Sequence, residues 1–134
     1  MRIPDLENLK KVFCRYPEIR AVYLFGSRAS GRVHRERDLD LAVLHDGDCL
    51  PEKKLDILAQ LAAEGFCDVD LVFLPQDNIV LQYEAIRMNH VVYQQPDFDR
   101  GSTYSLVVRQ YLDFLPFLEV QRKALKERLL NDKA

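Results

Sequence analysis

The chain lacks tryptophan, and it holds only five glycines, six prolines and three cysteines among 134 residues. No apolar run approaches the roughly 20 residues that a membrane-spanning helix needs, and the start of the chain, MRIPDLENLKK, does not resemble a signal peptide. Cys14, Cys49 and Cys67 are odd in number and have the spacing of neither a zinc site nor a disulfide framework. These absences predict a cytoplasmic protein with reduced thiols and no membrane partner.

An excess of charge of one sign is also missing, because 19 Lys and Arg face 21 Asp and Glu, for a net charge of −2. This balance does not favour a nucleic-acid-binding surface, so we expect no direct nucleic-acid partner. The hydrophobic content of 48% is that of an ordinary globular protein. The length predicts a single domain over residues 1–134, in which residues 1–96 form a catalytic core and residues 97–134 a helical tail.

The periodicity of apolar residues predicts a mixed α/β protein. We expect helices at residues 4–13, 50–64, 78–88 and 98–130, and strands at residues 20–25, 39–44, 69–74 and 90–94. In the second helix the inward residues should include Leu55 and Leu61, and Asp77 should cap the third helix. Gly65 should end the second helix and Asn89 the third. In the last helix Leu125 and Leu129 are inward candidates, and Pro116 should kink or split it. A straight helix of about thirty residues spans about 45–50 Å, which exceeds the body of a domain this size.

The most informative stretch, at residues 23–44, reads YLFGSRASGRVHRERDLDLAVL. We expect Gly26 and Ser27 to form the turn between a strand and a short helix at residues 27–30. Glycine has no Cβ, so backbone N–H groups there can approach a phosphate closely. Ser27 adds a hydroxyl, and the free N–H groups at a helix start favour an anion. With Arg28 as the best placed nearby cation, these residues predict a nucleotide-phosphate site.

A pair of carboxylates follows this turn, because ten residues separate Ser27 from Asp38, and Asp38 and Asp40 open the second apolar run. Residues two apart on a strand project from one face, and paired carboxylates are suitable ligands for Mg²⁺. For a two-metal site we expect a third carboxylate from an adjacent strand. Asp70 is the better candidate, and Asp68, on the same face, is the alternative. The plainer interpretations are a capping turn before the strand and, for Asp70, a solvated residue at the sheet edge.

The compound pattern Gly26-Ser27, ten residues, Asp38-x-Asp40 resembles the signature of the DNA polymerase β-like nucleotidyltransferases, and the short length is similar to their minimal members. The resemblance implies a mixed sheet of about four strands flanked by helices, with a long C-terminal helix. It also implies ATP as substrate and two Mg²⁺ ions held by Asp38, Asp40 and Asp70. In this family the Gly-Ser turn binds the β- and γ-phosphates.

The best-known minimal members are antitoxins paired with HEPN-domain toxins. The resemblance therefore implies that this chain transfers AMP from ATP to a tyrosine hydroxyl of a HEPN RNase toxin, with which it forms a hetero-oligomer. The residues themselves favour a large acceptor, because no second domain follows the strands to enclose a small one. Two alternatives stay open: a non-catalytic antitoxin that acts by occlusion, and a nucleotidyltransferase for small, aminoglycoside-like acceptors that is completed by dimerisation.

Overall fold

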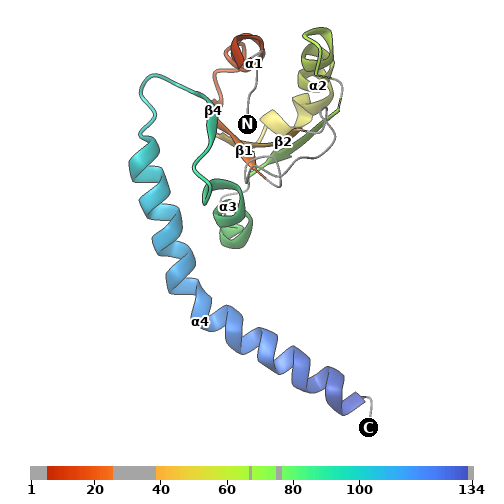
Figure 1. The fold of residues 1–134 in the computed structure, drawn as a ribbon, viewed down its shortest axis with the longest axis vertical. Coiled ribbons are helices and arrows are strands. Elements are labelled where there is room, and N and C mark those ends of the chain that lie inside the picture. Colours follow the sequence, from red (N-terminus) through yellow and green to blue (C-terminus); the bar gives the residue numbers. More distant parts are fainter. Residues whose placement is uncertain (1–5, 26–38, 67, 75–76, 133–134) are drawn as a thin grey trace.

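A four-stranded mixed sheet with helices on both faces forms the body of the protein, and a long helix extends from it (Figure 1). The computed structural model describes residues 6–25, 39–66, 68–74 and 77–132. Its elements are α1 (Leu6–Phe13), β1 (Ile19–Phe25), β2 (Leu39–His45), the 3₁₀ helix η1 (Leu50–Lys53), α2 (Lys54–Ala63), β3 (Val69–Phe73), α3 (Ile79–Ile86), β4 (Val91–Gln94) and α4 (Arg100–Asp132). The predicted fold class is confirmed, while the short helix expected at residues 27–30 lies outside the described residues.

The strands lie in the order β3-β2-β1-β4. β1 is antiparallel to both β2 and β4, and β2 is parallel to β3. A parallel pair needs a crossover connection, which η1 and α2 provide between β2 and β3. The start of β2 therefore lies beside the start of β3 and the end of β1.

Side chains of the central strands alternate between two hydrophobic cores, as expected for a sheet covered on both faces. The first core joins one face to α1 and α2, and its fully buried members include Phe13, Val22 and Leu41. The second core joins the other face to α3 and the first turns of α4, and it includes Tyr23, Ala42, Leu74, Ala85, Ile86 and Val107.

The helix expected at residues 50–64 begins as a 3₁₀ turn that contains Pro51 and becomes α-helical at Lys54. The prediction that Leu55 faces the core is wrong, because its side chain is 81% exposed. Ile57 and Leu61, one α-helical turn apart, are fully buried instead. At 100° per residue Leu55 lies about 160° around the helix from Ile57, so it faces solvent when Ile57 faces the core.

The cap of α3 also differs from its prediction. The side chain of Asn78, not Asp77, accepts a hydrogen bond from the Leu81 N–H at 3.0 Å. Asn78 therefore precedes the helix directly and satisfies one of its free donors. The predicted stop at Asn89 is confirmed, since this residue follows the helix and adopts a left-handed conformation with φ 53°.

Helix α4 contains 33 residues and runs through Pro116 without interruption, so the predicted split does not occur. Figure 1 shows it bending midway, as a proline inside a helix favours. The inward placement predicted for Leu125 and Leu129 is wrong, because their side chains are 52% and 54% exposed. Within the described part of the chain, no helix is long and apolar enough to cross a membrane.

Candidate active site

Two of the predicted carboxylates are direct neighbours across the sheet. Asp40 in β2 pairs with Asp70 in β3, and on its other side with Phe25, the last residue of β1. Paired residues in parallel strands project from the same face, and adjacent strands lie about 4.8 Å apart. Both side chains share the face of Ala42, which is the face covered by α3 and α4. Asp40 is half-buried and Asp70 is exposed, so the pair opens toward solvent at the edge where β1 ends.

The register favours Asp70 over Asp68 as the third predicted carboxylate. Asp68 precedes β3, and its carbonyl accepts a hydrogen bond from the Leu39 N–H at 3.0 Å. This bond lies at the start of the parallel pairing, one residue before Asp40. Asp68 precedes the paired residues of β3, so it does not lie opposite Asp40. The assignment of Asp70 stays a prediction that this register supports.

The remaining predicted site residues, Gly26, Ser27, Arg28 and Asp38, lie outside the described residues. In the sequence Gly26 directly follows the end of β1, and Asp38 directly precedes the start of β2. Their roles stay predictions.

Asp40 and Asp70 suit a magnesium ion by their chemistry, because Mg²⁺ prefers carboxylate oxygens. Within the described residues no group of three or more His, Cys, Asp or Glu side chains is arranged to hold a metal ion. The pair therefore supplies part of a ligand set, which the predicted ligand Asp38 would extend.

The turn between α3 and β4 lies beside the same edge of the sheet, a feature that the sequence analysis missed. The His90 carbonyl accepts a hydrogen bond from the Leu24 N–H at 2.8 Å, which places the turn next to the end of β1. Arg100, in the first turn of α4, donates from Nε to the Asn89 side-chain oxygen at 3.0 Å and from a terminal nitrogen to the Asn89 carbonyl. The sequence signal for this turn was the asparagine at position 89, since asparagine tolerates the left-handed conformation that it adopts here.

The imidazole of His90 is half-buried. Its burial, together with the positive charge of Arg100, lowers its pKa below the ordinary value of 6.5. His90 is therefore a neutral side chain at pH 7, beside the end of β1.

A family model described as polymerase beta, nucleotidyltransferase matches residues 7–98 of this chain. The chain belongs to this family. The matched residues run from α1 past β4 and include both carboxylate-bearing strands. The predicted family is thereby confirmed, and the chain is a polymerase β-like nucleotidyltransferase.

Relatives of this nucleotidyltransferase resemble it over nearly their whole length. Protein adenylyltransferase MntA of Shewanella oneidensis is 27% identical over 120 residues, which cover 88% of this chain and 81% of the relative. A crystal structure of a toxin–antitoxin with AMP-PNP superposes with a TM-score of 0.68 and 23% identity, over 94% of this chain and 98% of that one. A chain in the structure of tri-AMPylated Shewanella oneidensis HEPN toxin in complex with MNT antitoxin superposes with a TM-score of 0.59 and 22% identity, over 92% of this chain and 97% of that one. These likenesses confirm the nucleotidyltransferase fold.

Proposed function

We propose that this nucleotidyltransferase is an antitoxin that transfers AMP from ATP to a tyrosine hydroxyl of a HEPN RNase toxin and forms a complex with it. The relative that is named an adenylyltransferase covers most of the chain. The similar structures include one with AMP-PNP and one with a tri-AMPylated HEPN toxin. AMP adds negative charge and bulk to its target, and this addition would block an RNase site.

The pairing of Asp40 with Asp70 is the observation that carries this proposal. Nucleotidyl transfer depends mainly on positioning and on stabilisation of charge near the phosphates. Two carboxylates on neighbouring strands, at the edge where the predicted phosphate turn begins, provide the required concentration of negative charge. Magnesium bound there would supply positive charge for the reacting phosphate oxygens.

The reaction forms one bond and breaks one. The tyrosine oxygen bonds to the α-phosphorus of ATP, the bond from that phosphorus to the bridging oxygen of the β-phosphate breaks, and pyrophosphate leaves with the bonding electrons. The phenolic proton is released. In this scheme Gly26 and Ser27 hold the β- and γ-phosphates with Arg28 nearby. Asp38 and Asp40 would hold both metal ions, and Asp70 would help to hold the ion that polarises the acceptor.

We expect a macromolecular acceptor, because the described part of the site is open to solvent. Asp70 is exposed, and the described elements place no second domain over it. A protein docked on this open side would bring its own walls to the site and exclude water from the reacting groups.

The test uses the purified chain, Mg²⁺, ATP labelled at the α-phosphate, and a co-expressed HEPN-domain protein as candidate partner. We expect label on the HEPN protein with the wild type and none with Asp40→Asn. A tight complex without label would contradict the enzymatic function and favour an occluding antitoxin. Absence of both label and complex would contradict the partner and would direct a screen toward small acceptors.

A further inference from the structure

The distal part of α4 makes no contact with the body. Every side chain from Glu119 to Asn131, a segment that we call the distal arm, is exposed. The proximal half of the helix is held by α3, where the rings of Tyr83 and Tyr111 stack at 3.8 Å with an interplanar angle of 6°. Figure 1 shows the arm projecting away from the sheet and its covering helices. The helix is therefore anchored at one end and unpartnered at the other.

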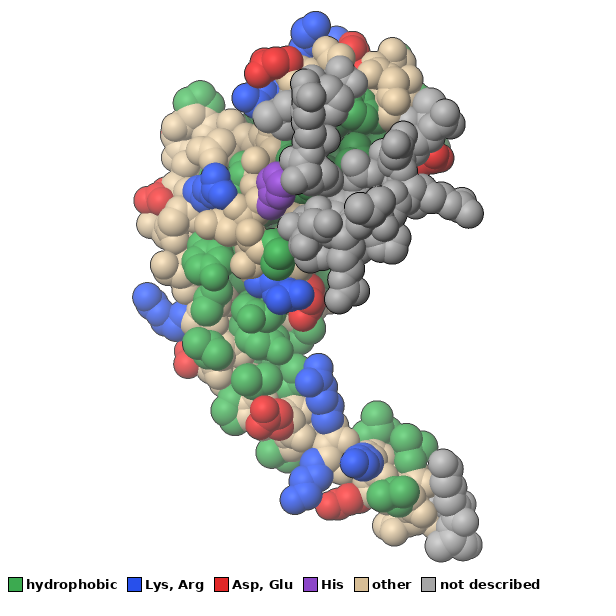
Figure 2. Space-filling model, viewed as in Figure 1, with side chains coloured by type: hydrophobic (Ala, Val, Ile, Leu, Met, Phe, Trp, Pro, Cys, Tyr) green, Lys and Arg blue, Asp and Glu red, His purple; other side chains and the backbone are tan. Residues whose placement is uncertain are grey.

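An apolar stripe runs along this helix from the body onto the arm. Phe114, Leu118, Leu125 and Leu129 follow one another at intervals of four, seven and four residues, which places them on one side of the helix. Leu125 and Leu129 are 52% and 54% exposed. The exposed side chain of Phe117 widens the apolar surface along one edge. Figure 2 shows such hydrophobic side chains along the distal half of α4, interspersed with basic ones.

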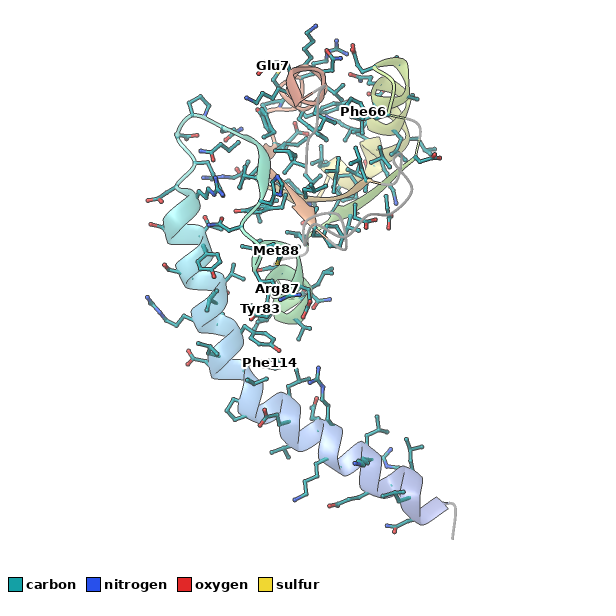
Figure 3. All side chains as sticks on the ribbon, viewed as in Figure 1. Glu7, Phe66, Tyr83, Arg87, Met88 and Phe114 are labelled. Carbon is teal, nitrogen blue, oxygen red and sulfur yellow. The ribbon has the colours of Figure 1, made fainter. Side chains whose placement is uncertain are left out.

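The stripe begins in a cleft between α3 and α4. This cleft has a volume of about 470 Å³, and Figure 3 labels Tyr83 and Phe114 where the two helices meet. Its lining combines the start of α3 with the first two stripe residues: Asp77, Asn78, Ile79, Val80, Phe114 and Leu118. The apolar surface is thus continuous from a recess in the body to the exposed arm.

Basic side chains flank the stripe. Arg122 and Lys126 lie along one flank and Arg128 along the other, by the helical spacing of 100° per residue. With Lys123, the arm has four cationic residues against the two acids Glu119 and Glu127, so its charge is +2 in a chain of net charge −2. A partner surface that complements the stripe has an apolar ridge bordered by carboxylates, which an amphipathic helix presents.

We propose that the stripe and its basic flanks dock the protein acceptor of the reaction, through a helical face of that acceptor that bears carboxylates. This inference rests on the proposed function. The first turns of α4 belong to the core on the sheet face from which Asp40 and Asp70 project, so a protein bound along this helix lies on the side of the carboxylates. Monomeric proteins rarely expose continuous apolar surfaces of this kind unless they bind a partner.

The test compares two substitutions of the same type on different sides of the arm. Leu125→Glu places a carboxylate on the stripe, while the control Leu130→Glu places it on another side of the helix, where the side chain is 58% exposed. Neither side chain is buried, so both variants should fold, and circular dichroism checks this. With the HEPN protein, we expect Leu125→Glu to weaken the Kd by about tenfold or more and Leu130→Glu to leave it within about twofold.

Initial rates of AMP transfer distinguish docking from catalysis. We expect Leu125→Glu to raise the KM for the HEPN protein and to leave the rate at saturating HEPN protein nearly unchanged, because the arm lies away from the carboxylates. Unchanged affinity in Leu125→Glu would overturn the docking proposal while transfer by the wild type would uphold the proposed function. Binding that Leu125→Glu weakens, without AMP transfer by the wild type, would uphold the docking proposal and overturn the proposed function.

The alternative partner for the stripe is a second copy of this chain, and light scattering of the isolated chain tests for it. Self-association that is lost in Leu125→Glu, with unchanged affinity for the HEPN protein, would overturn the proposal and assign the stripe to a homodimer. A monomeric wild type whose HEPN binding weakens in Leu125→Glu would support it. A wild type that neither binds nor modifies the HEPN protein would overturn both proposals.

Discussion

Asp40 and Asp70 are direct partners in the parallel register of β2 and β3. The two residues are thirty positions apart in the chain, and the crossover through η1 and α2 brings them together on one face of the sheet. The antiparallel pairing of Asp40 with Phe25 places the same carboxylate next to the end of β1. Three strands therefore meet at one edge, at the position where the sequence predicts the phosphate turn.

Substitution of either partner should abolish transfer without unfolding the protein. Asp40→Asn and Asp70→Asn each remove a negative charge at nearly constant volume. We expect each to reduce the rate of AMP transfer by at least about 100-fold, because loss of a metal-binding charge costs several kcal/mol of transition-state stabilisation.

Asp68→Asn is the matched control for these variants. Asp68 precedes the strand and does not pair with Asp40, so we expect activity within a few fold of the wild type in the same assay. Loss of activity in Asp68→Asn with retention in Asp70→Asn would show that Asp68 is the third carboxylate.

The burial in α2 predicts opposite outcomes for two similar truncations. Ile57→Ala removes a fully buried side chain and should lower the free energy of unfolding by about 2–5 kcal/mol. Leu55→Ala shortens a side chain that is 81% exposed and should change it by less than about 0.5 kcal/mol. Urea denaturation measures both, and a larger loss in Leu55→Ala would contradict the observed phase of the helix.

Two tyrosines should respond differently to the loss of their hydroxyl groups. The Tyr16 hydroxyl donates to Asp56 at 2.5 Å and accepts from Gln60 at 2.6 Å, so Tyr16→Phe should cost about 1 kcal/mol. The Tyr23 hydroxyl is buried, and within the described residues it has no hydrogen-bond partner. Tyr23→Phe should therefore leave the free energy of unfolding unchanged or raise it. Equal losses in both variants would contradict this difference.

Alkaline pH should destabilise the fold through the same two groups. Burial raises the pKa of Tyr23 to about 12, and burial with the Asp56 hydrogen bond raises that of Tyr16 to about 12. Because these pKa values exceed the ordinary 10.0, the contribution of the two neutral tyrosines to the free energy of unfolding is complete below pH 10. It is lost as the pH rises toward 12. Denaturation at several pH values should show this loss, with a smaller dependence in Tyr16→Phe. Stability that stays constant over this range would contradict it.

The sequence predicted the elements better than their contacts. Apolar runs and the stops at Gly65 and Asn89 identified the strands and helices, because these signals are local. In α2 both Leu55 and Ile57 are apolar, and periodicity alone placed Leu55 inward although Ile57 is the buried residue. Leu125 continues the apolar pattern of α4, but it is exposed because the helix projects beyond the rest of the protein at this point. The apolar pattern alone does not show where a helix loses contact with the other elements.

In the candidate site, too, local patterns could be predicted from the sequence, while contacts between distant parts of the chain could not. The Gly26-Ser27 and Asp38-x-Asp40 pattern could be read directly, since its spacing within the chain defines it. The sequence already favoured Asp70 over Asp68, and the strand register, which the sequence could not give, supports that choice by placing Asp70 opposite Asp40. The position of the Asn89 turn beside β1 depends on the hydrogen bond between Leu24 and His90, which joins distant parts of the chain.

Intact mass spectrometry of the HEPN protein, co-expressed with this chain, tests the central claim most directly. With the wild type, we expect the mass to increase by whole AMP units, and peptide fragmentation should place them on tyrosine. Co-expression with Asp40→Asn should leave the mass unchanged and the toxin active. An unmodified HEPN protein that the wild type still neutralises would contradict the account, because neutralisation would then require binding alone.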